Sequence, residues 1–184
     1  EILIGLVGSE MCIRDRNTVG EGFEKGTVFL PQLLMSAEAA KTAFAVLKEK
    51  MDSSGEVQEK KGKIILATVK GDIHDIGKNI VKVLLENYSF DVIDLGKDVP
   101  PETIVDTVLE QDIHLVGLSA LMTTTVVSME ETIRQLREKA PHCLVMVGGA
   151  VLNQDYADMI GADFYGKDAM QSVHYAQRVF GTEE

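Results

Sequence analysis

Residues 63–77 read KIILATVKGDIHDIG, and this stretch decides the fold. Its first seven residues, 63–69, form a nearly continuous apolar run, which is expected of a strand buried on both faces of a parallel sheet. Apolar residues at helical spacing come after the stretch, namely Ile80, Val81, Leu84, Leu85 and Tyr88. The sequence therefore predicts a buried strand, a polar loop and a helix that packs on the sheet.

The same alternation of strand and helix continues toward the C-terminus. Further strands are predicted at residues 90–94, 113–119, 143–147 and 162–165. Five βα units in a row indicate an open parallel sheet with helices on both faces. Five units also favour the flavodoxin-like strand order 2-1-3-4-5. We therefore predict a doubly wound, five-stranded α/β fold.

The residues before the first strand divide into three segments. In residues 17–51, apolar side chains recur three or four apart, which predicts a truncated all-α helical cap. Residues 52–62, DSSGEVQEKKG, read as a linker to the α/β domain at 63–184. We expect residues 1–16 to be non-native, because VGSEMCIRDR resembles translated sequencing-adapter sequence. The natural protein is then expected to extend further toward its N-terminus.

Composition narrows the class of protein without naming a function. The 184 residues are 45% hydrophobic and 26% charged, which is typical of a globular protein. The net charge of -11 argues against nucleic-acid and anionic-membrane partners. No apolar run approaches the roughly 18 residues of a membrane span. With only Cys12 and Cys143, a reducing, cytoplasmic setting is expected.

Three loops are expected at the carboxyl ends of strands, where open parallel sheets bind ligands. They are residues 70–77, 119–125 and 148–150. In the first loop, the Asp72 carboxylate could accept a hydrogen bond from one ring nitrogen of His74 and leave the other free for a metal. This pair makes His74 the candidate metal ligand.

Other readings of His74 stay open at this point. A lone His after a strand is more often a structural or surface residue than a ligand. One His with two Asp could also indicate a hard-metal or phosphoryl-transfer site. However, no further His, Cys or Glu in the other loops completes a coordination sphere. A single protein ligand suits a metal that arrives inside a macrocycle.

Three motifs follow the first, third and fourth predicted strands in order: Asp72-x-His74-x-x-Gly77, Ser119-x-Leu121 and Gly148-Gly149. Each motif is weak alone, but together they resemble proteins that bind cobalamin with its benzimidazole base replaced by a protein His. The resemblance covers the chain from Phe23 to the C-terminus. It implies cobalamin, carried as methylcobalamin, as the cofactor and cobalt as the metal.

The resemblance also implies a role for individual residues. His74 would be the lower axial ligand of cobalt, Asp72 its hydrogen-bond partner, and Thr125 the hydroxyl that contacts Asp72; these three form the expected catalytic set. The other residues of the α/β domain implied to contact the cofactor are Gly71, Asp75, Gly77, Ser119, Leu121, Thr123, Gly148, Gly149 and Ala169.

Within that set, three glycines (Gly77, Gly148 and Gly149) would leave room for the displaced nucleotide tail, because a Cβ would obstruct it. The hydroxyls of Ser119 and Thr123 would bind the base of the tail. Their alternative role, shared with Thr125, is to cap the following helix, although capping would explain only one of the three.

The resemblance extends to the predicted helical cap. Four apolar residues match the cap that covers the upper face of the ring in methyl-carrying corrinoid proteins: Phe23, Phe29, Leu30 and Leu33. Ordinary packing inside a helical hairpin is the alternative reading of these residues.

Among cobalamin proteins, the sequence of residues 68–87 and 162–181 is interpreted as more similar to methionine synthase, which transfers methyl groups to homocysteine. The expected partners are methyl-donor and methyl-acceptor methyltransferase domains or subunits and a reductive reactivation partner. The first alternative is a stand-alone corrinoid protein of a methanol, methylamine or methoxyarene methyltransferase system. An adenosylcobalamin mutase domain and a flavodoxin-like nucleotide or flavin binder are further alternatives.

Overall fold

A computed structural model describes residues 60–182 and, nearer the N-terminus, Gly22, Lys25, Thr27, Phe29, Pro31 and Met35. The chain separates into two units, Glu1–Glu59 and Lys60–Glu184. In the first unit, Gly22 is helical, and Thr27 donates its N–H (2.8 Å) and its Oγ1 (3.0 Å) to the Gly22 carbonyl. Pro31 and Met35 are helical as well.

The sheet of the second unit has five parallel strands: β1 (Lys63–Thr68), β2 (Asp91–Asp94), β3 (Leu115–Ser119), β4 (Leu144–Gly148) and β5 (Phe164–Tyr165). Their spatial order is β2-β1-β3-β4-β5, which confirms the predicted flavodoxin-like fold. The order reverses between β1 and β3, so the crevice that binds ligands in such folds is expected at their carboxyl ends.

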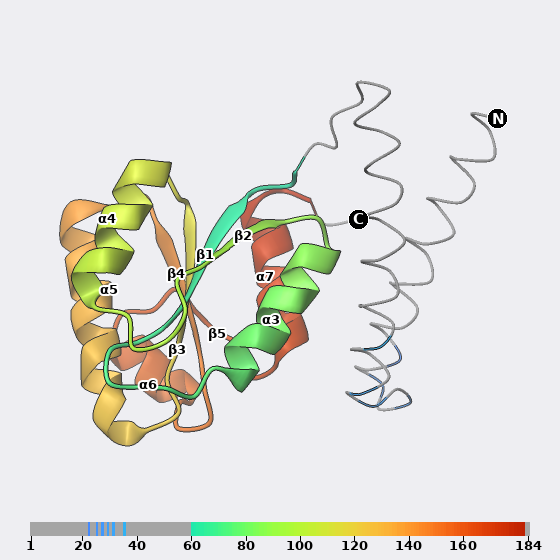
Figure 1. Ribbon diagram of the computed structural model, residues 1–184, viewed down its shortest axis with the longest axis horizontal. Helices are drawn as coiled ribbons and strands as arrows, with labels where there is room; N and C mark the ends of the chain where they lie inside the picture. Colours follow the sequence, from blue (N-terminus) through green and yellow to red (C-terminus); the bar gives the residue numbers. More distant parts are fainter. Residues whose placement is uncertain are drawn as a thin grey trace. The chain divides into compact units, whose positions relative to one another are not determined.

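Five helices connect and cover the strands: α3 (Ile76–Asn87), α4 (Pro101–Gln111), α5 (Val126–Lys139), α6 (Gln154–Met159) and α7 (Ala169–Val179). Figure 1 shows α4 and α5 on one face of the sheet and α3 and α7 on the other. The sequence did not predict α6, because six residues carry too little periodicity. Its first turn is capped by the Asn153 side chain, which accepts the Tyr156 N–H at 2.8 Å.

The core follows the alternation of side chains along β1. Ile65, Ala67 and Val69 belong to the buried cluster that includes apolar residues of α4 and α5. Ile64 and Leu66 are also buried, and strand geometry points them to the opposite face, covered by α3 and α7. Both faces of β1 are therefore dry, as the apolar run predicted.

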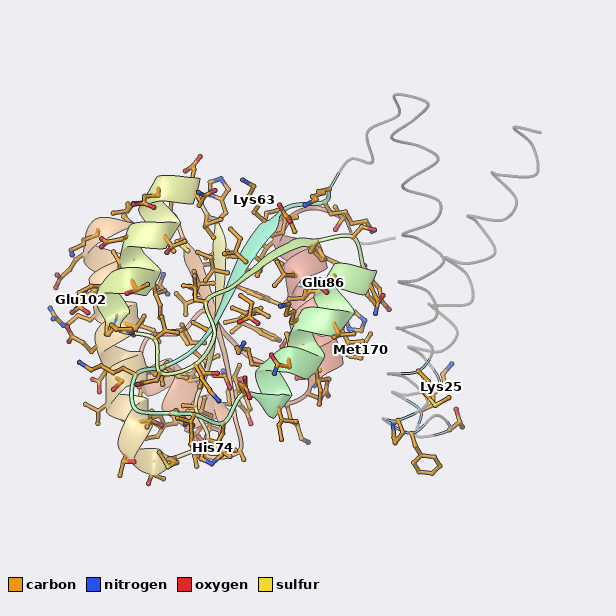
Figure 2. All side chains as sticks on the ribbon, viewed as in Figure 1. Lys25, Lys63, His74, Glu86, Glu102 and Met170 are labelled. Atoms are coloured by element: carbon orange, nitrogen blue, oxygen red, sulfur yellow. The ribbon has the colours of Figure 1, made fainter. Side chains whose placement is uncertain are left out.

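The strand ends place the candidate site. Figure 2 shows Lys63 at one end of β1 and His74 beyond the other, so the loop after β1 lies at the carboxyl edge of the sheet. Among the described residues, no helix has both the length and the apolar character needed to cross a bilayer.

Candidate functional site

The loop between β1 and α3 turns Asp72 inward and His74 outward. Gly71 has φ +85°, a left-handed conformation that glycine adopts without strain. The turn closes where the Asp72 N–H donates to the Val69 carbonyl at 3.1 Å. Asp72 is fully buried, whereas 47% of the His74 side chain is exposed.

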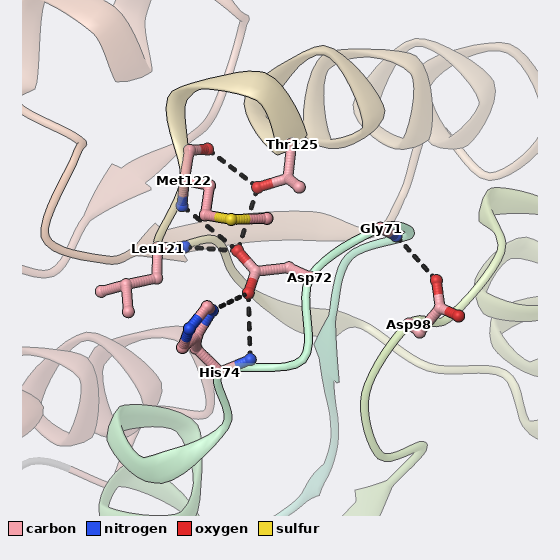
Figure 3. Close-up of polar contacts among 7 residues, drawn as sticks. All are labelled: Gly71, Asp72, His74, Asp98, Leu121, Met122 and Thr125. Carbon is pink, nitrogen blue, oxygen red and sulfur yellow. Dashed lines mark hydrogen bonds and ion pairs between the residues drawn. The ribbon is translucent and has the colours of Figure 1, made fainter.

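Asp72 fixes both the position and the tautomer of His74 (Figure 3). Its Oδ1 accepts the His74 backbone N–H at 3.0 Å and lies 2.8 Å from the ring Nδ1. An ionised carboxylate only accepts hydrogen bonds, so in the neutral imidazole Nδ1 carries the proton and Nε2 has the lone pair. The exposed ring therefore presents a nitrogen that can bind a metal.

The other oxygen of Asp72 is held by the loop after β3. Its Oδ2 accepts the N–H groups of Leu121 (2.7 Å) and Met122 (3.3 Å) and lies 3.0 Å from Thr125 Oγ1. Thr125 Oγ1 is also 2.8 Å from the Met122 carbonyl, so two acceptors compete for its single proton. The carboxylate thus joins the loops after the two central strands.

The donors around Asp72 also determine its charge. Burial alone would raise the pKa of Asp72, but the His74 and Leu121 backbone N–H groups, the His74 ring and the Thr125 hydroxyl together hold that pKa well below its usual range. A negative charge beside Nδ1 makes the imidazole a stronger electron donor. The site therefore keeps a charged partner under His74 at neutral pH.

Asp98 holds the same loop by two hydrogen bonds, and the sequence did not predict this role. Its Oδ1 accepts the Gly71 N–H at 2.7 Å, and its own N–H donates to the Asp72 carbonyl at 2.9 Å (Figure 3 draws the first bond). Asp98 itself has φ +54°. It fixes the main chain on both sides of the Asp72 α-carbon. Asp98 follows the second predicted strand, and this position at the carboxyl edge of the sheet could have indicated it as a site residue.

An ion pair between a buried lysine and a half-buried aspartate anchors the first turns of α3, and the sequence did not predict it. Lys78 is 4% exposed and pairs with Asp94 at the end of β2. Asp94 also accepts the Lys82 ammonium at 3.1 Å and the Gly96 N–H at 2.9 Å. Burial raises the pKa of Asp94, but the Lys78 bond and the other donors lower it overall.

The glycines of the predicted tail site differ in what surrounds them. A Cβ on Gly149, whose φ is +146°, would lie 1.8 Å from the Ala120 carbonyl oxygen, so the protein's own backbone already excludes a side chain there. A Cβ on Gly148 would meet nothing closer than the Gly166 carbonyl at 3.5 Å. For Gly77, nothing lies within 4 Å, which leaves open space at the start of α3.

The remaining predicted residues lie around this edge. Ser119 ends β3 and is half-buried, Thr123 is exposed in the 3₁₀ turn Thr123–Thr125, and Ala169 begins α7. Asp75 precedes α3 and makes no side-chain cap bond. Thr125 makes none at the start of α5 either, so its hydroxyl serves Asp72 rather than the helix.

Of the four predicted cap residues, the structure describes one. Phe29 is exposed, and Phe23, Leu30 and Leu33 lie outside the described residues. Their role over the ring stays a prediction.

Exposed apolar side chains lie in the loop that carries His74 and in the loop that holds Asp72, and we call them the apolar rim. They come from the loops after β1 and β3 and the start of the helices that follow: Ile73, Ile76, Leu121, Met122 and Val127. Over residues 60–182 and the six described earlier ones, no three His, Cys, Asp or Glu side chains converge to hold an ion by themselves. One imidazole nitrogen available for a metal, with exposed apolar side chains in the same loops, fits a metal that brings its other ligands in a flat macrocycle, as in a corrinoid.

Comparisons with known proteins agree with this chemistry. Residues 62–174 match the B12 binding domain family, and residues 16–48 match a second family with the same description. Trimethylamine corrinoid protein 1 of Methanosarcina acetivorans is 43% identical over 163 residues, 88% of this chain and 76% of the relative.

Two solved structures are similar as well. A novel cobalamin-binding protein from Desulfitobacterium hafniense DCB-2 has a TM-score of 0.75 and 37% identity over 89% of this chain and 77% of its own. A chain of the methanol:cobalamin methyltransferase complex MtaBC from Methanosarcina barkeri has a TM-score of 0.84 and 31% identity, over 95% of this chain and 67% of that one.

The fold and the His74 loop define a cobalamin-binding α/β domain preceded by a B12-binding cap. The chain belongs to the corrinoid proteins, which carry methyl groups in methyltransferase systems.

This finding corrects one expectation. The methionine synthase reading is wrong, because the matched relatives are corrinoid proteins of methylamine and methanol systems and this chain spans two thirds or more of their length. Residues 68–87 and 162–174 fall within the match to the B12 binding domain family, and cobalamin binding is common to both groups, so their sequence did not distinguish the two.

Proposed function

We propose that this chain is the methyl-carrying corrinoid protein of a methylamine methyltransferase system, with His74 as the lower ligand of cobalt. One observation carries the proposal: Asp72 Oδ1 holds Nδ1 of His74 at 2.8 Å, while 47% of the His74 side chain stays exposed at the carboxyl edge of the sheet. The identity to a trimethylamine corrinoid protein supports methylamines as the methyl source.

Bound cobalamin supplies the chemistry, since its cobalt can accept a methyl group from one molecule and give it to another. The chain's own residues supply position and charge. Asp72 keeps His74 in the tautomer that can ligate, and the loop after β3 keeps Asp72 ionised. The apolar rim, with Ile73 and Leu121, would offer apolar contact to a bound ring and would exclude water there.

The helical unit before the α/β domain completes the proposal. Residues 17–51 would act as the cap whose apolar residues shield a bound ring, and residues 52–62 would be its linker. Separate methyl-donor and methyl-acceptor methyltransferases load and unload the carrier, and a reductive partner reactivates it. The match of residues 16–48 to a B12 binding domain family supports the cap, and the similarity to a chain of a methyltransferase complex supports a methyltransferase partner.

Methanol is the second candidate for the methyl source. The similarity to a chain of the methanol:cobalamin methyltransferase complex favours it. Chemically reduced, cobalamin-loaded protein can be offered trimethylamine or methanol, each with its own methyltransferase. Methylation is then followed by the change in visible absorption. The proposal expects trimethylamine to react faster, and a reaction with methanol alone would replace it by the second candidate.

Ligation by His74 has its own experiment. The parent, His74→Ala and the control His114→Ala are incubated with methylcobalamin and desalted. His114 suits the control because it is exposed and precedes β3, at the opposite edge of the sheet. We expect the parent and the control to share one absorption spectrum and His74→Ala to differ. Identical spectra for all three would remove His74 as the ligand, and colourless protein would remove cobalamin binding altogether.

A further inference from the structure

Thr68, the last residue of β1, has a polar atom that the fold leaves without a partner. Its side chain is fully buried, and within the described part of the chain Oγ1 has no hydrogen-bond partner. Its backbone groups are satisfied, since the N–H donates to Gly96 (3.0 Å) and the carbonyl accepts from Val99 (3.0 Å). Only the hydroxyl is orphaned.

A buried hydroxyl without a partner destabilises the folded state, because it loses its hydrogen bonds to water and gains none in the protein. Valine has nearly the same shape and lacks this cost, so the threonine does not serve the ligand-free fold. Gln135 Oε1 is the other orphaned atom in the described chain, but the same amide donates to Glu131 at 2.8 Å and belongs to α5. Thr68 is thus the orphan that lies near the candidate site.

The register of the sheet places Thr68 directly below the cofactor loops. Thr68 pairs with Ser119, and Ser119 pairs with Gly148, so the three residues form one row across β1, β3 and β4. Because Ala67 and Val69 belong to the cluster under α4 and α5, alternation points Thr68 toward the face covered by α3 and α7.

The row contains little side-chain volume. Gly148 has no side chain, and the nearest atom to its ideal Cβ is the Gly166 carbonyl oxygen at 3.5 Å. A Cβ on Gly166 would lie 2.6 Å from Ser172 Oγ of α7. By register and strand alternation, Thr68 and Ser119 direct their hydroxyls to the face that α7 covers, where Ser172 Oγ also lies.

We infer that Thr68 Oγ1 is a hydrogen-bonding group for the nucleotide tail of the corrinoid, and that it favours a heteroaromatic base with a polar atom facing β1. The inference rests on the proposed function, because a tail reaches this row only if cobalamin binds with its own base displaced. A hydroxyl can donate to a ring nitrogen or accept from an N–H or O–H of the base. A buried polar group left unpaired discriminates against ligands that lack its partner.

The test compares Thr68→Val with the parent for two ligands, hydroxocobalamin and cobinamide, which lacks the nucleotide tail. The expected result is a roughly fivefold to tenfold weaker Kd for hydroxocobalamin and an unchanged Kd for cobinamide. The midpoint of urea unfolding of the ligand-free protein should stay equal or rise. Loss of a merely structural residue would lower that midpoint and leave the ratio of the two affinities unchanged.

Thr132→Val is the matched control. Thr132 is also fully buried, but its Oγ1 donates to the Ser128 carbonyl at 2.7 Å inside α5. This variant should lower stability and leave both affinities unchanged. Thr68→Ser keeps the hydroxyl and should keep the preference for the ligand with a tail.

The experiment distinguishes a wrong inference about Thr68 from a wrong proposed function. If the parent binds both ligands and Thr68→Val binds both equally well, the inference about Thr68 is overturned while the corrinoid carrier stands. A Thr68→Val protein that does not fold also overturns it, because removing an orphaned hydroxyl should cost nothing. If the parent takes up neither ligand, the carrier function itself is wrong, and the inference falls with it.

Discussion

Asp72→Asn changes one oxygen of the buried carboxylate into an NH₂ group and tests the centre of the site. Asp72 has five donor groups within hydrogen-bond distance, two at Oδ1 and three at Oδ2, and one of the three, the Thr125 hydroxyl, shares its proton with the Met122 carbonyl. The amide oxygen can replace only one carboxylate oxygen, and the side with three donors should take it. The amide NH₂ then faces the backbone N–H and the ring of His74.

Two consequences follow for the variant. The His74 N–H loses its acceptor and the remaining bonds lose their charge, which should cost about 2–4 kcal/mol of unfolding free energy. His74 Nδ1 must now accept from the amide, so the proton moves to Nε2 and the metal-binding lone pair is lost. The variant should be less stable and should also bind methylcobalamin without ligation by His74.

Urea unfolding of the ligand-free proteins at several pH values measures the first consequence. The pKa of Asp72 is lowered on folding, so its contribution is fully present above the unfolded value, about 4, and is lost as the pH falls toward the folded value. The stability difference between the parent and Asp72→Asn should therefore be largest at pH 7 and shrink below about pH 4.

The control for this experiment is Asp75→Asn, which removes a neighbouring carboxylate that makes no helix-cap bond. It should change stability by less than about 0.5 kcal/mol. Equal stability of the parent and Asp72→Asn at pH 7, or a difference that does not depend on pH, would refute the reasoning about the five donors.

Three further predictions concern the surroundings of the site. Gly149→Ala should cost more than about 3 kcal/mol of stability or prevent folding, because its Cβ would fall 1.8 Å from the Ala120 oxygen; thermal unfolding measures this, and a Tm like that of the parent would contradict it. Lys78→Met should cost about 2–4 kcal/mol in urea unfolding, since it leaves Asp94 with a weaker partner; an unchanged midpoint would show that the ion pair contributes nothing. Burial raises the pKa of the Cys143 thiol to about 12, so alkylation at pH 8, followed by mass spectrometry of its peptide, should label Cys143 only after unfolding.

Much of the α/β fold could be predicted from the chain itself. Apolar runs marked the strands within about two residues, and the alternation with helices implied a parallel sheet. The short helix α6 escaped because six residues do not show a period, and its cap residue Asn153 was the only local signal.

The candidate site was only partly predictable, for a reason of distance along the chain. Asp72 and His74 are two residues apart, so their pairing could be proposed from sequence. Asp98 lies 27 residues from Gly71, and no local pattern reports a hydrogen bond between a loop and a carboxylate from another loop. The choice of methionine synthase over a stand-alone corrinoid protein was wrong, because the motifs of a shared cofactor-binding domain do not distinguish the proteins that contain it.

By itself, the sequence determined the strands, their parallel arrangement and the His74 loop, because these depend on hydrophobic pattern and on residues adjacent in the chain. Only the tertiary structure decided that donors surround the Asp72 carboxylate. It also decided that the Thr68 hydroxyl has no hydrogen-bond partner within the described residues. Both depend on which backbone groups of β3 and its loop come to lie beside β1. Strand register sets that proximity, and it results from packing the whole sheet between its helices.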